Sequence, residues 1–165
     1  MFSFKLDDDF KFDCNCTNLQ ETYFSFYNGN LPPGGSSFPN IIRIGTGTFY
    51  NCNMENLSIN SNVQYIGATA FSGFTGNIIG EKSSSYENAQ VFKVEEIGEY
   101  AFSSLSNSHV FEFPNLKKIG DYAFATKENS NVKHTIYITS NDAFEYSKTS
   151  FGEEKTNTVY MSKTL

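Results

Sequence analysis

The segment Ile119-Gly120-Asp121-Tyr122-Ala123-Phe124 decides the fold of this chain, because closely similar segments occur four times in all. The other copies begin at Ile44, Ile66 and Ile97, and a weaker fifth copy ends in Asn141-Asp142-Ala143-Phe144. The phenylalanines of the five copies lie 22, 31, 22 and 20 residues apart. An apolar signature that returns at about this period is typical of a solenoid, in which each copy forms one coil. Stacked coils bury an apolar edge that a single coil leaves exposed.

Short alternating segments predict the strands of the coils. The clearest is Phe111-Glu112-Phe113-Pro114, and the segments 135–138 and 158–161 follow the same apolar-x-apolar pattern. Alternate residues of a strand point to opposite faces, so the apolar members are expected to face inward. The Ala-Phe pair that closes each copy suits one turn of helix, with the ring filling the space between coils. We therefore expect a mainly β chain, a short right-handed solenoid with stacked parallel strands and small helical turns.

A single domain accounts for the 165 residues of the chain, which suffice to bury one core. Residues 1–36 are expected to form an N-terminal β cap over the stack, because residues 2–13 alternate around the polar turn Asp7-Asp8-Asp9. The solenoid then occupies residues 37–165 with about five coils, one for each copy. Residues 75–90 interrupt the second repeat, and we expect them to form a polar loop that bulges from the stack.

Charge and composition exclude several classes of function. The formal net charge is −6 and the 12 Lys and Arg residues are scattered, whereas nucleic-acid binding needs clustered positive charge. No segment is apolar over the length of a membrane-spanning helix, so no membrane insertion is expected. The N-terminal residues lack the features of a signal peptide, so we expect either a chain that stays in the cell or one from which a leader was removed. Three cysteines cannot all pair within one chain, and free buried thiols are predicted, which favours a reducing compartment.

Recognisable catalytic and metal-binding motifs do not occur in the sequence. His109 and His134 lie next to predicted strands, and we interpret both as surface or strand-end residues. Asp7-Asp8-Asp9 with Asp13 could attract calcium, but the spacing and the distal Glu of a calcium loop are missing. Cys14-Asn15-Cys16 lacks a second pair of ligands for a soft metal. No catalytic residue, no metal and no cofactor is therefore predicted.

Tyrosines are the strongest candidates for binding. Tyr137 and Tyr160 lie between inward-facing neighbours on strands, so alternation turns both rings outward. Exposed aromatic side chains suit the binding of a protein or a carbohydrate. Stacking that only stabilises the sheet would use the same residues. Both interpretations stay open, and they apply equally to Tyr65, Tyr100 and Tyr122.

Four outward positions are expected to form one row across a sheet face. Neighbouring strands lie about 4.8 Å apart, which brings side chains at matching positions together. Two phenol rings and a carboxylate offer apolar area and hydrogen bonds, which favour a binding hot spot. The predicted site for a partner consists of Ser58, Glu112, Tyr137 and Tyr160. The loop 75–90 and the capped ends of the stack are the alternative positions.

The repeated pattern Val-x-x-Ile-Gly-x-x-Ala-Phe, with Cys52 three residues after Phe49, resembles the BspA-type leucine-rich repeat. The resemblance covers residues 38–144 and implies a leucine-rich-repeat-like solenoid. Proteins of this family are mostly surface or secreted proteins that bind host matrix proteins or other cells. The resemblance thus implies a secreted or cell-surface module for adhesion, with a protein as partner and carbohydrate as the alternative ligand.

Three hypotheses on function follow, in order of preference. The first is a non-catalytic module that binds a protein or another ligand on the sheet surface of the solenoid. The second is a structural component of a larger assembly, such as a virion or a surface layer, which the compact length and the Phe-rich edges favour. The third is an enzyme whose site is assembled across coils. A large exposed apolar patch or a solution mass above one chain distinguishes the second hypothesis from the first.

Overall fold

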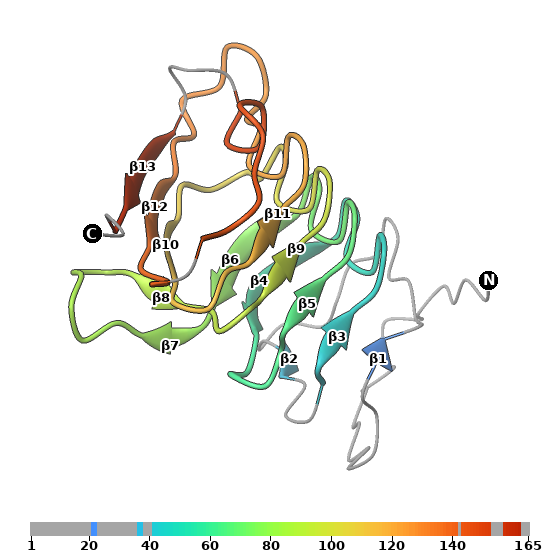
Figure 1. The fold of residues 1–165 in the computed structure, drawn as a ribbon. Coiled ribbons are helices and arrows are strands. Elements are labelled where there is room, and N and C mark those ends of the chain that lie inside the picture. Colours follow the sequence, from blue (N-terminus) through green and yellow to red (C-terminus); the bar gives the residue numbers. More distant parts are fainter. Residues whose placement is uncertain (1–20, 23–35, 38–40, 142, 153–156, 163–165) are drawn as a thin grey trace.

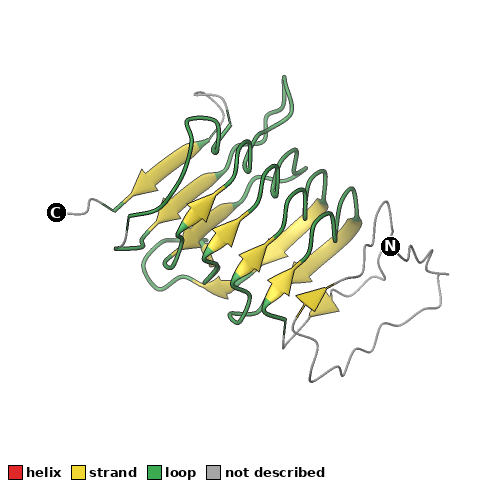
Figure 2. Cartoon of the chain, turned by 45° about the vertical axis from the view of Figure 1, so that its right-hand side comes forward, coloured by secondary structure: helices red, strands yellow, loops and turns green. Residues whose placement is uncertain are grey.

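The computed structural model describes residues 21–22, 36–37, 41–141, 143–152 and 157–162. Within these residues the chain is a β-solenoid of stacked parallel strands without helices, as Figures 1 and 2 show. Each coil runs along a short strand, passes over an arc of turns and returns along a second strand (Figure 1). The predicted mainly β solenoid is confirmed. Apart from β1 and β2, the predicted cap of residues 1–36 lies outside the described residues, together with Cys14, Cys16 and the Asp7–Asp9 turn.

Three sheets line the coils. The short-strand sheet is parallel and consists of β1 (Glu21–Thr22), β3 (Arg43–Ile44), β5 (Tyr65–Ile66), β9 (Glu96–Ile97) and β11 (Lys118–Ile119). The three-stranded sheet is also parallel and consists of β2 (Ser36–Ser37), β4 (Asn53–Ser58) and β6 (Thr75–Ile79). The C-terminal sheet has the order β13-β12-β10-β8-β7, and these strands are β7 (Glu81–Lys82), β8 (Gln90–Val91), β10 (Val110–Phe113), β12 (Thr135–Ile138) and β13 (Thr158–Met161). Only the β7–β8 pair is antiparallel among these strands.

A ladder of phenylalanine rings forms the core. Phe71, Phe102 and Phe124 are each 0% exposed, as the repeat pattern predicts. Their ring centroids lie 5.2 Å apart from coil to coil, with interplanar angles of 9° and 11°. Phe49 extends the ladder at one end at 5.3 Å from Phe71. Each ring therefore fills the space between two coils, and burial of this area is the main force that holds the stack together.

The fifth phenylalanine of the ladder is Phe151, and the expectation from the weak copy ending in Phe144 is wrong. Phe151 stacks on Phe124 with centroids 6.1 Å apart at an angle of 12°. Lys118 of β11 forms a parallel bridge with Glu145. This register places residue 151 beside Phe124, whereas Phe144 precedes the bridge and contacts Tyr146 instead. The bridge rather than the local motif thus decides which ring continues the ladder, while Phe144 and Phe151 are both partly buried against the core.

The arcs are chains of turns, so the predicted helical turns do not occur in the described coils. In the arc after β5, Ala70, Ser72 and Phe74 each donate a backbone hydrogen bond to the residue three positions earlier. Thr69 lies between these turns with a φ of 53°, in the left-handed region. A left-handed residue interrupts a right-handed helix. The N–H groups of Thr69 and Phe71 instead donate to carbonyl oxygens of the next coil.

Close approach of the coils explains the glycine of the repeat. A Cβ atom on Gly98 would lie 2.5 Å from the backbone nitrogen of Ala68 on the preceding coil. A Cβ atom on Gly120 would lie equally close to the backbone nitrogen of Glu99. Only glycine permits this backbone contact at the point where each coil leaves the short-strand sheet.

The insertion begins later than the sequence predicts. Residues 75–79 form strand β6 of the three-stranded sheet, and the excursion starts at Gly80. The chain leaves the stack as β7 and returns as β8, which pairs with β10 in the place that β6 would otherwise occupy. The three-stranded sheet therefore ends at β6, and the C-terminal sheet begins with the inserted hairpin (Figure 1).

Candidate functional site

The C-terminal sheet holds three of the four predicted site residues in one row. Glu112 of β10 pairs in register with Tyr137 of β12, and Tyr137 pairs with Tyr160 of β13. Ser58 does not join this row, because it lies on β4 of the three-stranded sheet, in register with Ser37 and Ile79. The predicted single row of four is therefore wrong. The inserted hairpin separates the three-stranded sheet from the C-terminal sheet. Alternation within a single strand does not reveal to which sheet that strand belongs.

A stack of three tyrosines dominates the outer face of the C-terminal sheet. The rings of Tyr137 and Tyr160 lie 5.0 Å apart at an angle of 12°. On the other side of Tyr137, the ring of Tyr86 stacks at 3.9 Å and 13°. Tyr86 and Tyr137 are half-buried, and Tyr160 is 53% exposed. We call Glu112, Tyr86, Tyr137 and Tyr160 together the tyrosine face.

Glu112 anchors the inserted loop on this face. Its Oε2 accepts a hydrogen bond from Ser83 Oγ at 2.5 Å, and its Oε1 accepts one from Thr139 Oγ1 at 3.4 Å. Ser83 Oγ in turn accepts hydrogen bonds from the backbone N–H groups of Ser85 and Tyr86, both at 3.0 Å. The carboxylate therefore holds the loop in the position that brings Tyr86 onto Tyr137.

Sequence reasoning did not identify Tyr86, because it places the residue in a polar loop. The available signal was a single aromatic residue within Glu81–Asn88, a segment that is otherwise polar. An aromatic side chain in such a loop frequently packs against another element, since exposure of the whole ring costs apolar burial. The ring on which Tyr86 packs, Tyr137, lies 51 residues later in the sequence, and only the structure of the sheet brings the two together.

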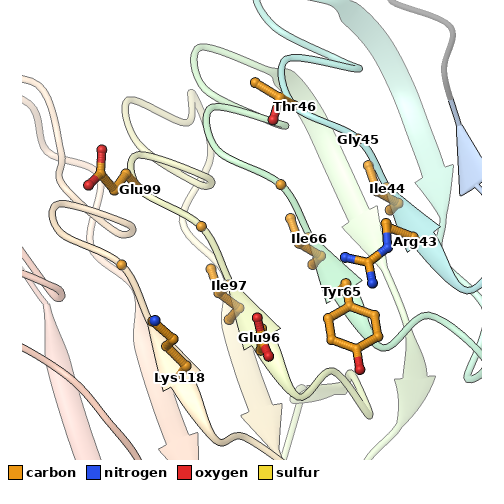
Figure 3. Close-up of a pocket in the computed structure, with 13 residues that line it drawn as sticks. Arg43, Ile44, Gly45, Thr46, Tyr65, Ile66, Glu96, Ile97, Glu99 and Lys118 are labelled. Carbon is orange, nitrogen blue, oxygen red and sulfur yellow. The ribbon is translucent and has the colours of Figure 1, made fainter.

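A charged groove crosses the short-strand sheet on a different side of the coil (Figure 3). It has a volume of about 370 Å³. One wall is an in-register row of Arg43, Tyr65, Glu96 and Lys118. The guanidinium carbon of Arg43 lies 4.0 Å from the centroid of the Tyr65 ring, which is a cation–π contact. The groove is also lined by glycines of the repeats, namely Gly45, Gly67, Gly98 and Gly120.

The remaining candidate tyrosines stand on the arcs. Tyr100 follows β9 and Tyr122 follows β11, so both occupy the same position on successive coils. Their rings stack at 5.2 Å and 15°. They are 42% and 37% exposed, which separates them from the buried phenylalanine ladder.

Both histidines are buried, so the predicted surface position is wrong, although each does precede a strand. His109 and His134 are 8% and 1% exposed. His109 Nε2 accepts a hydrogen bond from the backbone N–H of Ile78 at 3.3 Å. His134 Nδ1 accepts one from the backbone N–H of His109 at 3.2 Å. Asn157 continues the series, since its Oδ1 accepts from the N–H of His134 at 2.9 Å. We call these three side chains the polar ladder.

The polar ladder has a structural role at neutral pH. Burial lowers the pKa of His109, and burial together with the charge of His109 lowers the pKa of His134 to about 4. Both rings are therefore neutral near pH 7, and their nitrogens serve as acceptors for backbone donors of the preceding coil. A buried imidazole whose acceptor nitrogen is already hydrogen-bonded is poorly placed to act as a general base.

Two further kinds of functional feature are absent from the part of the chain that the structure describes. In these residues no group of three or more His, Cys, Asp and Glu side chains is arranged to hold a metal ion. Likewise, no helix in the described ranges is long and apolar enough to span a membrane. Cys52 is 0% exposed, in the buried position predicted for the cysteines.

The fold and the repeats define a solenoid repeat protein. A family model, the BspA type leucine rich repeat region, matches residues 23–150 with six copies. The chain therefore belongs to the BspA-type leucine-rich repeat family, which confirms the resemblance noted from the sequence. Searches of curated proteins and of solved structures found no match. The family is generally a non-enzymatic repeat module, and it suggests a protein-interaction or adhesion-type role.

Proposed function

We propose that the chain is a non-catalytic binding module whose partner, a protein, docks on the tyrosine face. The observation that supports this most directly is the exposed end of the stack, Tyr160, whose ring is covered on one side by Tyr137 and is 53% exposed overall. Tyrosine is enriched in interface hot spots, because a rigid ring with a hydroxyl group provides area and a hydrogen bond at little entropic cost.

The inserted loop contributes to the proposed surface. Glu112 holds Ser83, and Ser83 positions Tyr86 on Tyr137. The ring pair is thus ordered before a partner arrives, which lowers the entropic cost of binding. Protein is the preferred partner, with a carbohydrate as the alternative ligand, and secretion or cell-surface location belongs to the same proposal through the family.

The test is a titration against immobilised extracellular-matrix proteins with matched variants. Tyr137→Ala with Tyr160→Ala removes the rings of the sheet, and Tyr86→Ala removes only the ring of the loop. We expect the double variant to lose binding by about tenfold or more, as is usual for a hot spot, while Tyr86→Ala loses less. Equal affinity of the double variant and the parent chain would contradict the tyrosine face as the docking site.

A structural role in a larger assembly is the second candidate. It is favoured by the exposed large side chains of the last described coil, since Tyr146, Tyr160 and Met161 are 53%, 53% and 41% exposed. Side chains of this size are commonly covered by a neighbouring subunit in an assembly. Light scattering distinguishes the two proposals, because a mass of one chain at high concentration supports the binding module and a multiple supports the assembly.

A further inference from the structure

The arcs after β9 and β11 carry an acidic and aromatic surface that the repeat itself does not require. Each of these two arcs has a carboxylate followed by a tyrosine, whereas the arcs of the two preceding coils have Thr46-Gly47 and Ala68-Thr69 at the same positions. The fold is therefore compatible with small residues there. We call the surface formed by Glu96, Glu99, Tyr100, Asp121 and Tyr122 the acidic ridge.

The backbone of the ridge is unfavourable for the residues that it holds. Tyr100 and Tyr122 both have a φ of 54°, in the left-handed region. Glycine adopts this conformation without the steric cost that a Cβ atom brings, and Gly47 does so at the matching position with a φ of 63°. Two successive coils thus keep a bulky, exposed ring where glycine would satisfy the backbone better.

The charge of the ridge is negative. Glu96 and Glu99 are exposed, and in the described part of the chain neither carboxylate has a hydrogen-bond or ion-pair partner. Among the residues that the structure describes, the hydroxyl groups of Ser147 and Thr149 are the hydrogen-bond donors to the Asp121 carboxylate. Hydroxyl donors leave the charge of a carboxylate uncompensated.

Nearby cations offset this charge only in part, although Lys118 lies in register with Glu96 on the adjacent strand. Lys117 pairs with Glu95 at 2.8 Å, and Lys118 pairs with Glu145 at 3.7 Å. Lys148 is exposed on the arc of the last coil. One lysine does not balance three carboxylates, so an excess of negative charge remains on the ridge. A partner of opposite charge gains favourable electrostatics at this surface.

The chain itself contains the geometry by which a cation binds to a tyrosine of a coil. Arg43 lies over the ring of Tyr65 on the adjacent coil, with the guanidinium carbon 4.0 Å from the ring centroid (Figure 3). A guanidinium group combines such stacking with bidentate hydrogen bonds to a carboxylate. The ridge offers both groups at consecutive positions of the chain, in the pairs Glu99-Tyr100 and Asp121-Tyr122.

We propose that the acidic ridge binds an arginine-rich extended segment of a partner protein, with guanidinium groups on the two tyrosine rings and against the carboxylates. This surface is distinct from the tyrosine face. Glu96 lies on β9 of the short-strand sheet and the other ridge residues lie on the arcs after β9 and β11, whereas Tyr137 and Tyr160 lie on the C-terminal sheet (Figure 1). Binding at the ridge and binding at the tyrosine face can therefore be tested separately.

The test uses the whole chain and a fluorescein-labelled peptide of alternating glycine and arginine, titrated at physiological ionic strength. A peptide with citrulline in place of arginine keeps the shape and removes the charge. We expect it to bind about tenfold more weakly or not at all, because the charge-assisted hydrogen bonds are lost. Equal binding of the two peptides, or no binding of the arginine peptide, overturns the proposal.

Matched variants assign the binding to the ridge. Tyr100→Gly with Tyr122→Gly introduces the residue found at position 47, and we expect a loss of about fivefold or more because two cation–π contacts disappear. Glu96→Gln with Glu99→Gln is expected to weaken binding by about tenfold. Glu55→Gln with Glu128→Gln removes the same net charge from exposed positions elsewhere and is expected to change little.

The outcomes are decisive in each arm. Equal losses in the two glutamine variants would show attraction by the net charge of the chain, and unchanged binding of the tyrosine variant would show that the rings play no part. Either result overturns the proposal. The variant Tyr137→Ala with Tyr160→Ala serves as the control for location and is expected to bind the arginine peptide like the parent chain.

Discussion

The phenylalanine ladder inside the stack and the tyrosine face outside it have nearly the same geometry. Phe102 and Phe124 stack at 5.2 Å and 11°, and Tyr137 and Tyr160 stack at 5.0 Å and 12°. Burial separates them, because Phe124 is 0% exposed and Tyr160 is 53% exposed. The coil spacing thus produces ring stacks on any side of the solenoid. Stacking alone therefore does not tell whether a ring stabilises the fold or binds a partner. The exposed fraction of the ring separates the two roles.

The largest expected loss of stability comes from a change in the phenylalanine ladder. Phe124→Ala should lower the free energy of unfolding by about 3–5 kcal/mol, the usual range for a large buried ring. In a chain of this size that loss corresponds to a fall in melting temperature of about 6 °C or more. Thermal denaturation followed by circular dichroism measures it. A melting temperature within a degree or two of the parent would show that the rings do not hold the coils together.

The next largest effect is expected at the polar ladder, whose histidines are buried like the phenylalanines but can bind a proton. The folded-state pKa of His134 is about 4, below its ordinary value of 6.5, so the unfolded chain binds more protons between these values. Stability is therefore complete above about pH 6.5 and falls as the pH is lowered toward 4. Between pH 7 and pH 5 we expect a loss of about 2 kcal/mol from this residue.

Asn157 provides the matched control for the histidine. It occupies the same place on the next coil and accepts from the backbone N–H of His134 at 2.9 Å without titrating. His134→Asn should therefore keep the acceptor and flatten the stability profile between pH 7 and pH 5. Urea denaturation at both pH values measures this. A profile as steep as that of the parent chain would assign the pH dependence to other groups.

These regions also show how much the sequence could predict. The positions of Phe71, Phe102 and Phe124 and the strands 135–138 and 158–161 followed from period and alternation, because both signals are local. Phe151 could not be predicted, since the Lys118–Glu145 bridge sets the register of the last coil. The burial of the histidines depends on donors from the preceding coil, about 25 to 31 residues away, and no local pattern records them.

The candidate site was predictable in part for the same reason. Alternation correctly separated the buried and outward residues of β10 and β12, which identified Glu112 and Tyr137. Tyr86 was missed and Ser58 was placed in the wrong row, because both depend on the path of the inserted hairpin. Binding at these residues stays a prediction.

A smaller effect is expected from the loop that covers the tyrosine face. Glu112→Gln keeps the size of the side chain but weakens the charge-assisted hydrogen bond from Ser83. We expect the free energy of unfolding to fall by about 1 kcal/mol and the loop to exchange its amide hydrogens faster at Ser85 and Tyr86. Hydrogen exchange measured by mass spectrometry reports this. Unchanged exchange in the loop would show that stacking on Tyr137, and not the carboxylate, holds it in place.

The smallest effect on stability, and the one that tests the comparison most directly, is expected from Tyr160→Ala. The ring is more than half exposed and covers Tyr137 on one side only, so about 0.5–1 kcal/mol is the most that an aromatic pair of this kind contributes. The melting temperature should therefore fall by no more than about 4 °C, while binding at the tyrosine face weakens severalfold. Phe124→Ala should do the reverse. It should lower stability strongly, and it should weaken binding only to the extent that the chain unfolds. If Tyr160→Ala unfolds the chain as readily as Phe124→Ala, the outer stack is part of the scaffold, and burial fails as the criterion that separates the two.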